Sequence, residues 1–357
     1  MDFTFTEDQL ALRDGVSRFL MTEAAPELLR EIWETDSGRS ASLRAKMAGQ
    51  GLTALSVPEP DGGLGLGDVD WALMTQELGY YAIPDSLADT AYVAVGVLAR
   101  LPAGHPLRAQ WLPRVVDGSA RLAVGHGVNP WVADAHLADL LLMACRTPAG
   151  EFQLHAVGAP SLRLTPQASI DASRRLSTVE WSPSQDSAFL SGEAAQQAWD
   201  EALDRGALNA AGQLVGLAQR MLDLSVDYAS QRRQFGKPIG SFQAVKHHLA
   251  EVATRIEFAK PVLYRAAAAL ASGDPLASAL VSHAKLVCGD AAWQAGRKGI
   301  QVHGAMGYTW EVDLQMFMKR AWVLDAAWGD RAFHKSRLAD ALFNPTAPLG
   351  PAATWPC

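Results

Sequence analysis

Two stretches in the second half of the chain decide the fold. Arg232–Gln243 reads RRQFGKPIGSFQ, and Gln301–Glu311 reads QVHGAMGYTWE. Each combines a cation or an amide with glycines and an aromatic residue, and each lies between long segments of helical periodicity. That composition suits the pyrophosphate and adenine of a dinucleotide better than it suits a packed core.

The segments around these two stretches have the period of helices. Leu214, Leu217, Met221, Leu224 and Tyr228 recur every three or four residues on one face. The pattern continues through 243–271 and 275–299, which predicts long antiparallel helices of a bundle. We therefore expect a C-terminal helical bundle over residues 191–345 that carries both stretches, followed by a loosely held tail over 346–357.

The first half of the chain divides into a helical part and a strand-rich part. Helical spacing over 8–23, 42–51, 68–81 and 88–100 predicts an N-terminal helical domain over residues 1–118, with Thr6 as the first N-cap. Short apolar or alternating runs at 137–145, 152–157, 162–164 and 179–181 predict a small middle β domain over 119–190. The expected fold class is mainly α with a small β domain.

Composition excludes several classes of protein. A chain of 357 residues with 49% hydrophobic and 19% charged residues is expected to be soluble and globular. Its apolar runs are too short to span a membrane, and its acidic and polar first residues do not suggest a signal peptide. A net charge of −7 without a basic run argues against nucleic acid as a partner, yet a few local cations suffice for a phosphate ligand.

The cysteines and histidines do not predict a metal site. Cys145, Cys288 and Cys357 are far apart in the sequence and odd in number, which fits a reducing, cytoplasmic location. His247 and His248 are adjacent, so a helix points them about 100° apart. His126 and His303 are likewise outside metal-ligand patterns, and we expect no bound metal.

The two stretches resemble the most recognisable motifs of the acyl-CoA dehydrogenases, FAD-dependent enzymes that oxidise the Cα–Cβ bond of acyl-CoA thioesters. Residues 1–10 (MDFTFTEDQL) and 57–67 (VPEPDGGLGLG) look like N-terminal signatures of the same family. The resemblance covers nearly the whole chain and implies helical, β and helical domains in that order, with a four-helix bundle at the C-terminus.

The resemblance implies which residues hold FAD. Arg232 would pair with the pyrophosphate and Phe235 would pack on the cofactor, whereas Gln243 and Gln301 have counterparts near its ADP half. Gly304 would allow close approach of the backbone. Taken singly, Arg232 could be a solvated helix charge, Phe235 a core residue and Gln301 a capping amide. Their joint spacing instead favours contact with FAD. Ala305 departs from the family, which usually has a second glycine there.

Two elements that the family uses for its own active site are missing. The flavin-binding loop of the Thr-Glu-Pro type is replaced by 122–130 (LAVGHGVNP), and the following Trp-Ile-Thr segment is not recognisable. The catalytic base of the family is a Glu at one of two positions, and Trp328 and Gly206 stand there in this chain. Asp330 is a weak substitute, and Asp204 matches a region where relatives contact CoA. The catalytic base is therefore unknown.

The retained elements are those that, in family dimers, reach the FAD of the neighbouring subunit. The leading hypothesis is the base-lacking subunit of a heteromeric acyl-CoA dehydrogenase, a heterotetramer of the steroid-degradation type, with an electron-transfer flavoprotein-like acceptor. A second hypothesis is a self-sufficient homomeric enzyme that uses Asp330 or another acid. A third is a flavin-free acyl-CoA-binding or scaffold protein. Gly206 and Ala207 are small, which hints at room for a bulky acyl group.

Overall fold

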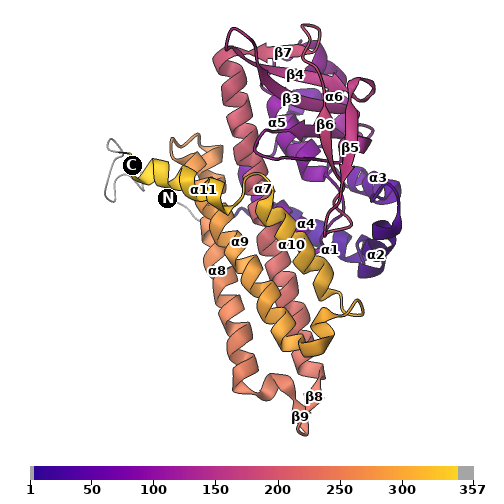
Figure 1. Cartoon of the computed structure of the whole chain (residues 1–357), viewed down its shortest axis with the longest axis vertical. Coiled ribbons are helices and arrows are strands. Elements are labelled where there is room, and N and C mark those ends of the chain that lie inside the picture. The colour runs from indigo at the N-terminus through magenta and orange to yellow at the C-terminus, as the bar shows by residue number, and fades with distance from the viewer. Residues whose placement is uncertain (1–3, 345–357) are drawn as a thin grey trace.

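The computed structural model of the chain describes residues 4–344, so the predicted tail over 346–357 lies outside the described residues. A helical N-terminal part and a small β part lie at one end, and a long helical bundle extends away from them to the β8–β9 hairpin (Figure 1). The chain is therefore mainly α with a small β domain, as the sequence predicts.

The N-terminal part consists of α1 (Glu7–Glu23), α2 (Pro26–Glu34), α3 (Ala41–Gly49), α4 (Asp68–Tyr80), the π-helical turn η2 (Asp89–Ala94), α5 (Val95–Leu98) and α6 (Pro106–Val116). Thr6 caps α1 as predicted. Its side-chain oxygen accepts from the Gln9 N–H, and the side-chain oxygen of Gln9 accepts from the Thr6 N–H, which forms a capping box. The sequence analysis did not predict α2 and α6. Both begin with proline, which the pattern treats as a break but which is favoured in the first turn of a helix.

The middle part forms two small sheets. One has the order β1 (Leu122–Gly125), β3 (Leu140–Arg146), β4 (Phe152–Gly158) and β7 (Ala188–Ser191), and the other has the order β2 (Val132–Ala133), β6 (Leu176–Glu180) and β5 (Arg163–Gln167). The β1–β3 pair is parallel, and the remaining pairs are antiparallel. Four of these strands correspond to the predicted runs, shifted by no more than three residues at either end.

The C-terminal part is the bundle of α7 (Gly192–Gln231), α8 (Gln243–Ala271), α9 (Ala277–His303) and α10 (Leu314–Ala326), with α11 (Arg331–Leu342) packed on α9. Helix α7 has 40 residues and runs from the β sheet to the hairpin of β8 (Arg233–Gln234) and β9 (Lys237–Pro238) (Figure 1). Helix α4 packs closely on α7 because Gly216 lacks a side chain. A Cβ there would lie 1.9 Å from the Gln76 carbonyl oxygen.

A buried ion pair joins the three parts. The guanidinium of Arg320 on α10 pairs with Asp171 of the β part, donates to the Ser173 hydroxyl, and donates to the Ile83 carbonyl at 3.0 Å. Both charged side chains are almost fully buried. Because a buried charge is costly without such partners, the pair fixes the helical and β parts relative to one another.

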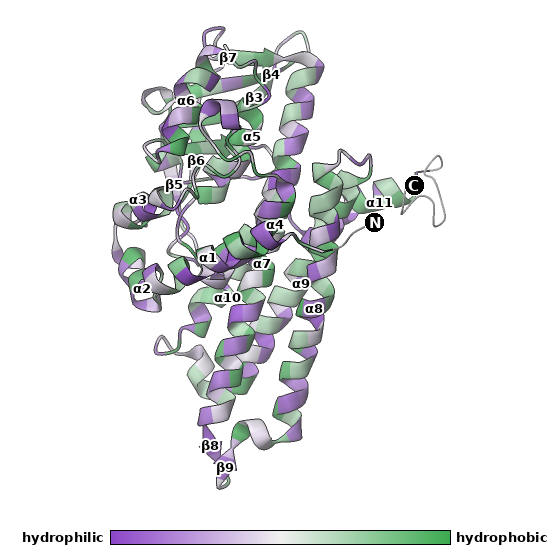
Figure 2. Cartoon of the chain, turned by 180° about the vertical axis from the view of Figure 1, so that it is seen from behind, coloured by the Kyte–Doolittle hydropathy of each residue, from purple (hydrophilic) through white to green (hydrophobic). Residues whose placement is uncertain are grey.

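The hairpin end of the bundle is hydrophilic at β8. Figure 2 shows hydrophilic colours at β8 and a mixture of hydrophilic and hydrophobic residues along the strands and the helices near them. Among residues 4–344, no helix is long and apolar enough to cross a membrane.

Candidate functional site

The first candidate site is the hairpin that follows α7. Arg232 is the C-cap of α7 and is exposed, and the strands β8 and β9 pair through Arg233 with Pro238. The turn between them is Phe235-Gly236, with φ of 53° and 82°. A phenylalanine rarely adopts a positive φ, and this one is 91% exposed. A strained and solvated aromatic ring is a feature that an external ligand or partner would explain.

The second stretch lies at the end of α9. Gln301 is exposed in the last turn, and Gly304 ends the helix with φ 60° and ψ −136°. A Cβ at Gly304 would meet nothing within 4 Å, so this backbone conformation alone requires glycine. Ala305 lies outside the positive-φ region, which explains why a second glycine is not needed there.

Tyr228 and His303 bring the two stretches together. Their rings stack with centroids 4.3 Å apart, and the Tyr228 hydroxyl donates to the His303 carbonyl at 3.3 Å. Arg232 follows Tyr228 by one turn, whereas Gln301 and Gly304 flank His303. The His303 ring donates from Nδ1 to the Gly299 carbonyl at 2.8 Å. His303 is thus a packing residue that the sequence analysis did not identify as the joint between the stretches.

We call Arg232, Phe235, Gln243, Gln301 and Gly304 the tip residues. All five are exposed at the hairpin end of the bundle, and Gln243 is the first residue of α8. A helix N-terminus attracts anions, and exposed guanidinium and amide groups bind phosphate oxygens. Such groups could hold the phosphate oxygens of a dinucleotide. Gly206, the base position on α7, lies 26 residues before Arg232, which is roughly 39 Å along the helix.

The second candidate site is the place where the resemblance puts the catalytic base. The two alternative base positions, Gly206 and Trp328, contact one another: a Cβ at Gly206 would lie 2.1 Å from the Trp328 ring. We call the space around them the base cleft. The expectation that Gly206 leaves room for a bulky acyl group is wrong in this conformation, because the indole ring takes up that room.

Other aromatic and basic groups close the base cleft. His126 stacks on Trp199 at 5.0 Å and lies 5.9 Å from the Trp328 ring. Burial lowers the pKa of His126 to about 4, so the ring is neutral at pH 7. The His334 ring donates to the Trp328 carbonyl at 2.9 Å, and the buried Lys285 donates to the neighbouring Gly329 carbonyl at 3.3 Å. Burial lowers the pKa of Lys285 to about 8.

The carboxylates near the base cleft have structural partners. Asp330 is exposed and caps α11, where its Oδ1 accepts from the Phe333 N–H at 2.8 Å. Asp204 is buried and accepts from Arg337 and the Ser278 hydroxyl, both at 2.6 Å. Burial raises the pKa of Asp204, although Arg337 opposes that effect. The hydrogen bonds of both acids go to Phe333, Arg337 and Ser278, so each serves the fold in this conformation.

The space left at the contact between the Trp328 ring and Gly206 is small. A cavity of about 30 Å³ lies between Trp328, Asn209, Asp89 and Arg174, and this is room for about one water. Cofactor sites usually occupy several hundred Å³. A larger cavity of about 310 Å³ adjoins it, lined by Asn129, Trp131, Arg174, Trp322 and Ala327. The Trp328 ring therefore leaves no room for a ligand at its contact with Gly206, whereas the adjoining cavity is open.

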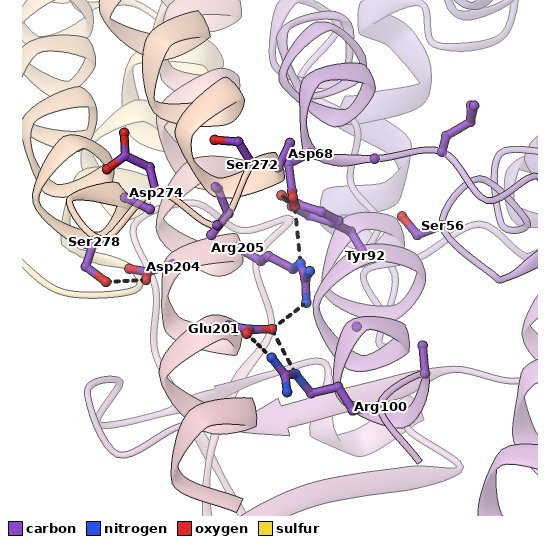
Figure 3. Close-up of a pocket in the computed structure, with 18 residues that line it drawn as sticks. Ser56, Asp68, Tyr92, Arg100, Glu201, Asp204, Arg205, Ser272, Asp274 and Ser278 are labelled. Carbon is purple, nitrogen blue, oxygen red and sulfur yellow. Dashed lines mark hydrogen bonds and ion pairs between the residues drawn. The ribbon is translucent and has the colours of Figure 1, made fainter. Parts of the chain in front are cut away.

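Another hollow lies beside α7. It has a volume of about 710 Å³ between α4, α5, α7 and the α8–α9 turn (Figure 3). Figure 3 shows Arg205 pointing at Asp68, and Glu201 between Arg205 and Arg100. Four carboxylates and two guanidinium groups line it, and both guanidinium groups are paired. This charge disfavours the phosphates of CoA.

Metal chemistry finds no support in the described range. Within residues 4–344, no three His, Cys, Asp or Glu side chains come together as metal ligands. His248 lies 3.1 Å from the Lys298 ammonium, and His247 is exposed.

Two family models match the chain. The acyl-CoA dehydrogenase N-terminal domain matches residues 6–119, and the acyl-CoA dehydrogenase C-terminal domain matches residues 197–343. The acyl-CoA dehydrogenase IpdE2 of Mycobacterium tuberculosis is 32% identical over 317 residues, which cover 88% of this chain and 91% of that protein.

Solved structures agree with these matches. A variant of the Tcur3481-Tcur3483 steroid acyl-CoA dehydrogenase superposes with a TM-score of 0.85 at 25% identity, over 96% of this chain and 99% of that one. The ChsE4-ChsE5 complex of Mycobacterium tuberculosis has the same fold, with a TM-score of 0.85 at 23% identity over 98% and 100% of the two chains. This chain therefore belongs to the acyl-CoA dehydrogenase family.

Proposed function

We propose that this chain is the base-lacking subunit of a heteromeric acyl-CoA dehydrogenase, and that its tip residues hold FAD bound in a homologous partner subunit. The observation that carries the proposal is the contact of Gly206 with Trp328, because neither position of the family base holds a carboxylate. The exposed tip residues support it, since they lie at the hairpin end of α7, 26 residues or more beyond Gly206 in the sequence.

The reaction that the family catalyses sets the roles in such a complex. A carboxylate removes the α-proton of the acyl thioester, and FAD accepts the hydride from the β-carbon. In our proposal the partner supplies the carboxylate and the acyl-CoA cleft. Arg232 binds the pyrophosphate, Phe235 packs on the cofactor, and Gln243 and Gln301 orient its ADP half. Gly304 leaves the backbone close enough to contact it.

The names of the similar proteins suggest the substrate class. One is a steroid acyl-CoA dehydrogenase, and another is a complex of two named components. By this similarity we propose a heterotetramer that acts on the CoA thioester of a steroid-derived acid, in the cytoplasm, and passes electrons to an electron-transfer flavoprotein-like acceptor.

The test is the visible flavin absorption of the purified chain, alone and after co-expression with a homologous acyl-CoA dehydrogenase encoded beside it. We expect flavin, and anaerobic bleaching by a ring-bearing acyl-CoA, only in the co-purified complex. Flavin and bleaching in the lone chain would instead establish the self-sufficient enzyme. A complex that forms without flavin would favour the scaffold protein.

The role of the tip residues is tested within the complex. Arg232→Met should weaken FAD retention about 10-fold to 100-fold, because it removes charge-assisted hydrogen bonds of about 1.5–3 kcal/mol. Lys335→Met is the matched control, since Lys335 is exposed on α11, far from the hairpin (Figure 1). Equal FAD retention in both variants would refute the assigned role of Arg232.

A further inference from the structure

The base cleft contains a side chain where other members of the family would hold ligands. The Trp328 ring is only 4% exposed, although the residue lies on the loop between α10 and α11. Three of its ring atoms lie within 2.5 Å of the position that a Gly206 Cβ would take. Real Cβ atoms do not come this close to a ring, so the ring can lie there only because residue 206 is glycine.

The backbone of the loop is also fitted to this placement. Trp328 has φ 57°, a conformation that costs a bulky residue about 1–3 kcal/mol, and the next residue is Gly329 with φ 96°. The loop is held by the Asn129 side chain, which accepts from the Trp328 N–H at 2.7 Å, and by His334, which donates to the Trp328 carbonyl. Contacts from the β part and from α11 thus hold one strained residue.

The cleft has little room left once the ring is in place. The cavity beside Trp328 has about 30 Å³, and buried charges, including those of Asp89 and Arg174, line it. Burial raises the pKa of Asp89, although Arg174 opposes that effect. A ligand at this position would have to displace the indole ring and would then lie against these charges.

We propose that the Trp328 side chain is an intramolecular occupant of this chain's own base cleft, which it closes to an acyl group beside residue 206, and that Gly206 makes room for it. This inference deepens the proposed function, because it gives a physical reason for a single working cleft per pair of unlike subunits. Gly206 and Trp328 form a reciprocal pair, in which a change at one is tolerated only with a change at the other.

The first test opens the cleft and refills it. Trp328→Gly removes the ring and suits the positive φ, so the loop keeps its conformation. We expect the melting temperature to fall by about 10 °C, and added indole to raise it again. Wild-type protein should not respond to indole. Trp310→Gly is the control, because Trp310 is 68% exposed and lines neither of the cavities beside Trp328.

The second test is a double-mutant cycle on the full chain. Gly206→Ala should lower the melting temperature of the wild type, because its methyl group meets the ring. In the Trp328→Gly background the same change should raise it, since alanine favours a helix over glycine. If Trp328→Gly does not fold, Trp328→Phe replaces it, and the loss caused by Gly206→Ala should shrink with the smaller ring.

Two results would overturn the inference. One is a Trp328→Gly protein that melts like the wild type and ignores indole, and the other is a Gly206→Ala effect that does not depend on residue 328. Neither test uses flavin, acyl-CoA or a partner subunit. Both tests can therefore be interpreted even if the proposed function is wrong.

Discussion

Two neutral histidines are built into the base cleft, and acid should weaken the fold through them. The His334 ring is fully buried between the Ser282 hydroxyl at 3.1 Å and the Trp328 carbonyl at 2.9 Å. A carbonyl only accepts, so Nε2 carries the proton and Nδ1 accepts from Ser282. Burial, together with the nearby Lys285 charge, lowers the pKa of His334 to about 4.

The magnitude follows from linkage. Both His334 and His126 have a pKa of about 4 in the folded chain, against an ordinary value of 6.5. Above pH 6.5 these histidines are neutral in both the folded and the unfolded chain, so they do not change the free energy of unfolding. Between pH 6.5 and 4 the unfolded chain binds protons that the folded chain refuses, so stability falls with pH. At 1.36 kcal/mol per pH unit, each histidine removes at most about 3 kcal/mol over this window.

The assay is urea denaturation at intervals from pH 7 to pH 4 for the wild type, His334→Gln and His247→Gln. His334→Gln will lower stability at pH 7, but its free energy of unfolding should then fall less steeply with decreasing pH, by about 1 kcal/mol per pH unit. His247 is exposed on α8, and its replacement removes a histidine without touching the cleft. Parallel curves for the wild type and His334→Gln across pH 6.5 to 4 would refute the reasoning.

Three further predictions concern the ion pair, the α9 terminus and the candidate base. Arg320→Met should lower the free energy of unfolding, measured by urea denaturation, by about 3–5 kcal/mol because it leaves Asp171 buried without its cation. Adding Asp171→Asn should recover part of this loss. A loss below about 1 kcal/mol in Arg320→Met would contradict the reasoning. Gly304→Ala should cost about 1–3 kcal/mol through its φ of 60°, and a neutral result would show that the α9 end relaxes. Asp330→Asn should keep both the α11 cap and acyl-CoA bleaching by the complex, while Asp330→Ala loses about 1 kcal/mol of stability; loss of bleaching in Asp330→Asn would identify Asp330 as the base.

The sequence predicted the order of helices and strands because that order depends on local periodicity. The apolar steps along α7 and the Thr6 capping box are short-range patterns, and both appear in the structure as expected. It failed at α2 and α6, where proline begins a helix instead of ending one. The turn at 88–100 was predicted as one helix, but it is π-helical over Asp89–Ala94 and α-helical over Val95–Leu98.

Part of the candidate site could likewise be predicted from the sequence, and part of it required the structure. Motif spacing alone marked Arg232, Phe235 and Gln301, since these residues lie within contiguous segments of sequence. Their exposure at one end of the bundle, and the Tyr228–His303 stack that joins them, required the packing of α7 on α9. No spacing rule relates residues that lie 75 positions apart on different helices.

The sequence by itself determined the family, and the resemblance put Gly206 and Trp328 at the two positions of the base, which is the loss of a carboxylate that we propose. Only the tertiary structure decided what that loss means for the cleft, because Gly206 and Trp328 are 122 residues apart in the sequence and meet only when α11 and its loop pack on α7 and α9. Read along the chain, a glycine at position 206 suggests empty space. In the folded chain the indole ring of Trp328 fills that space, because protein interiors are closely packed and rarely leave a cavity that a neighbouring side chain can fill.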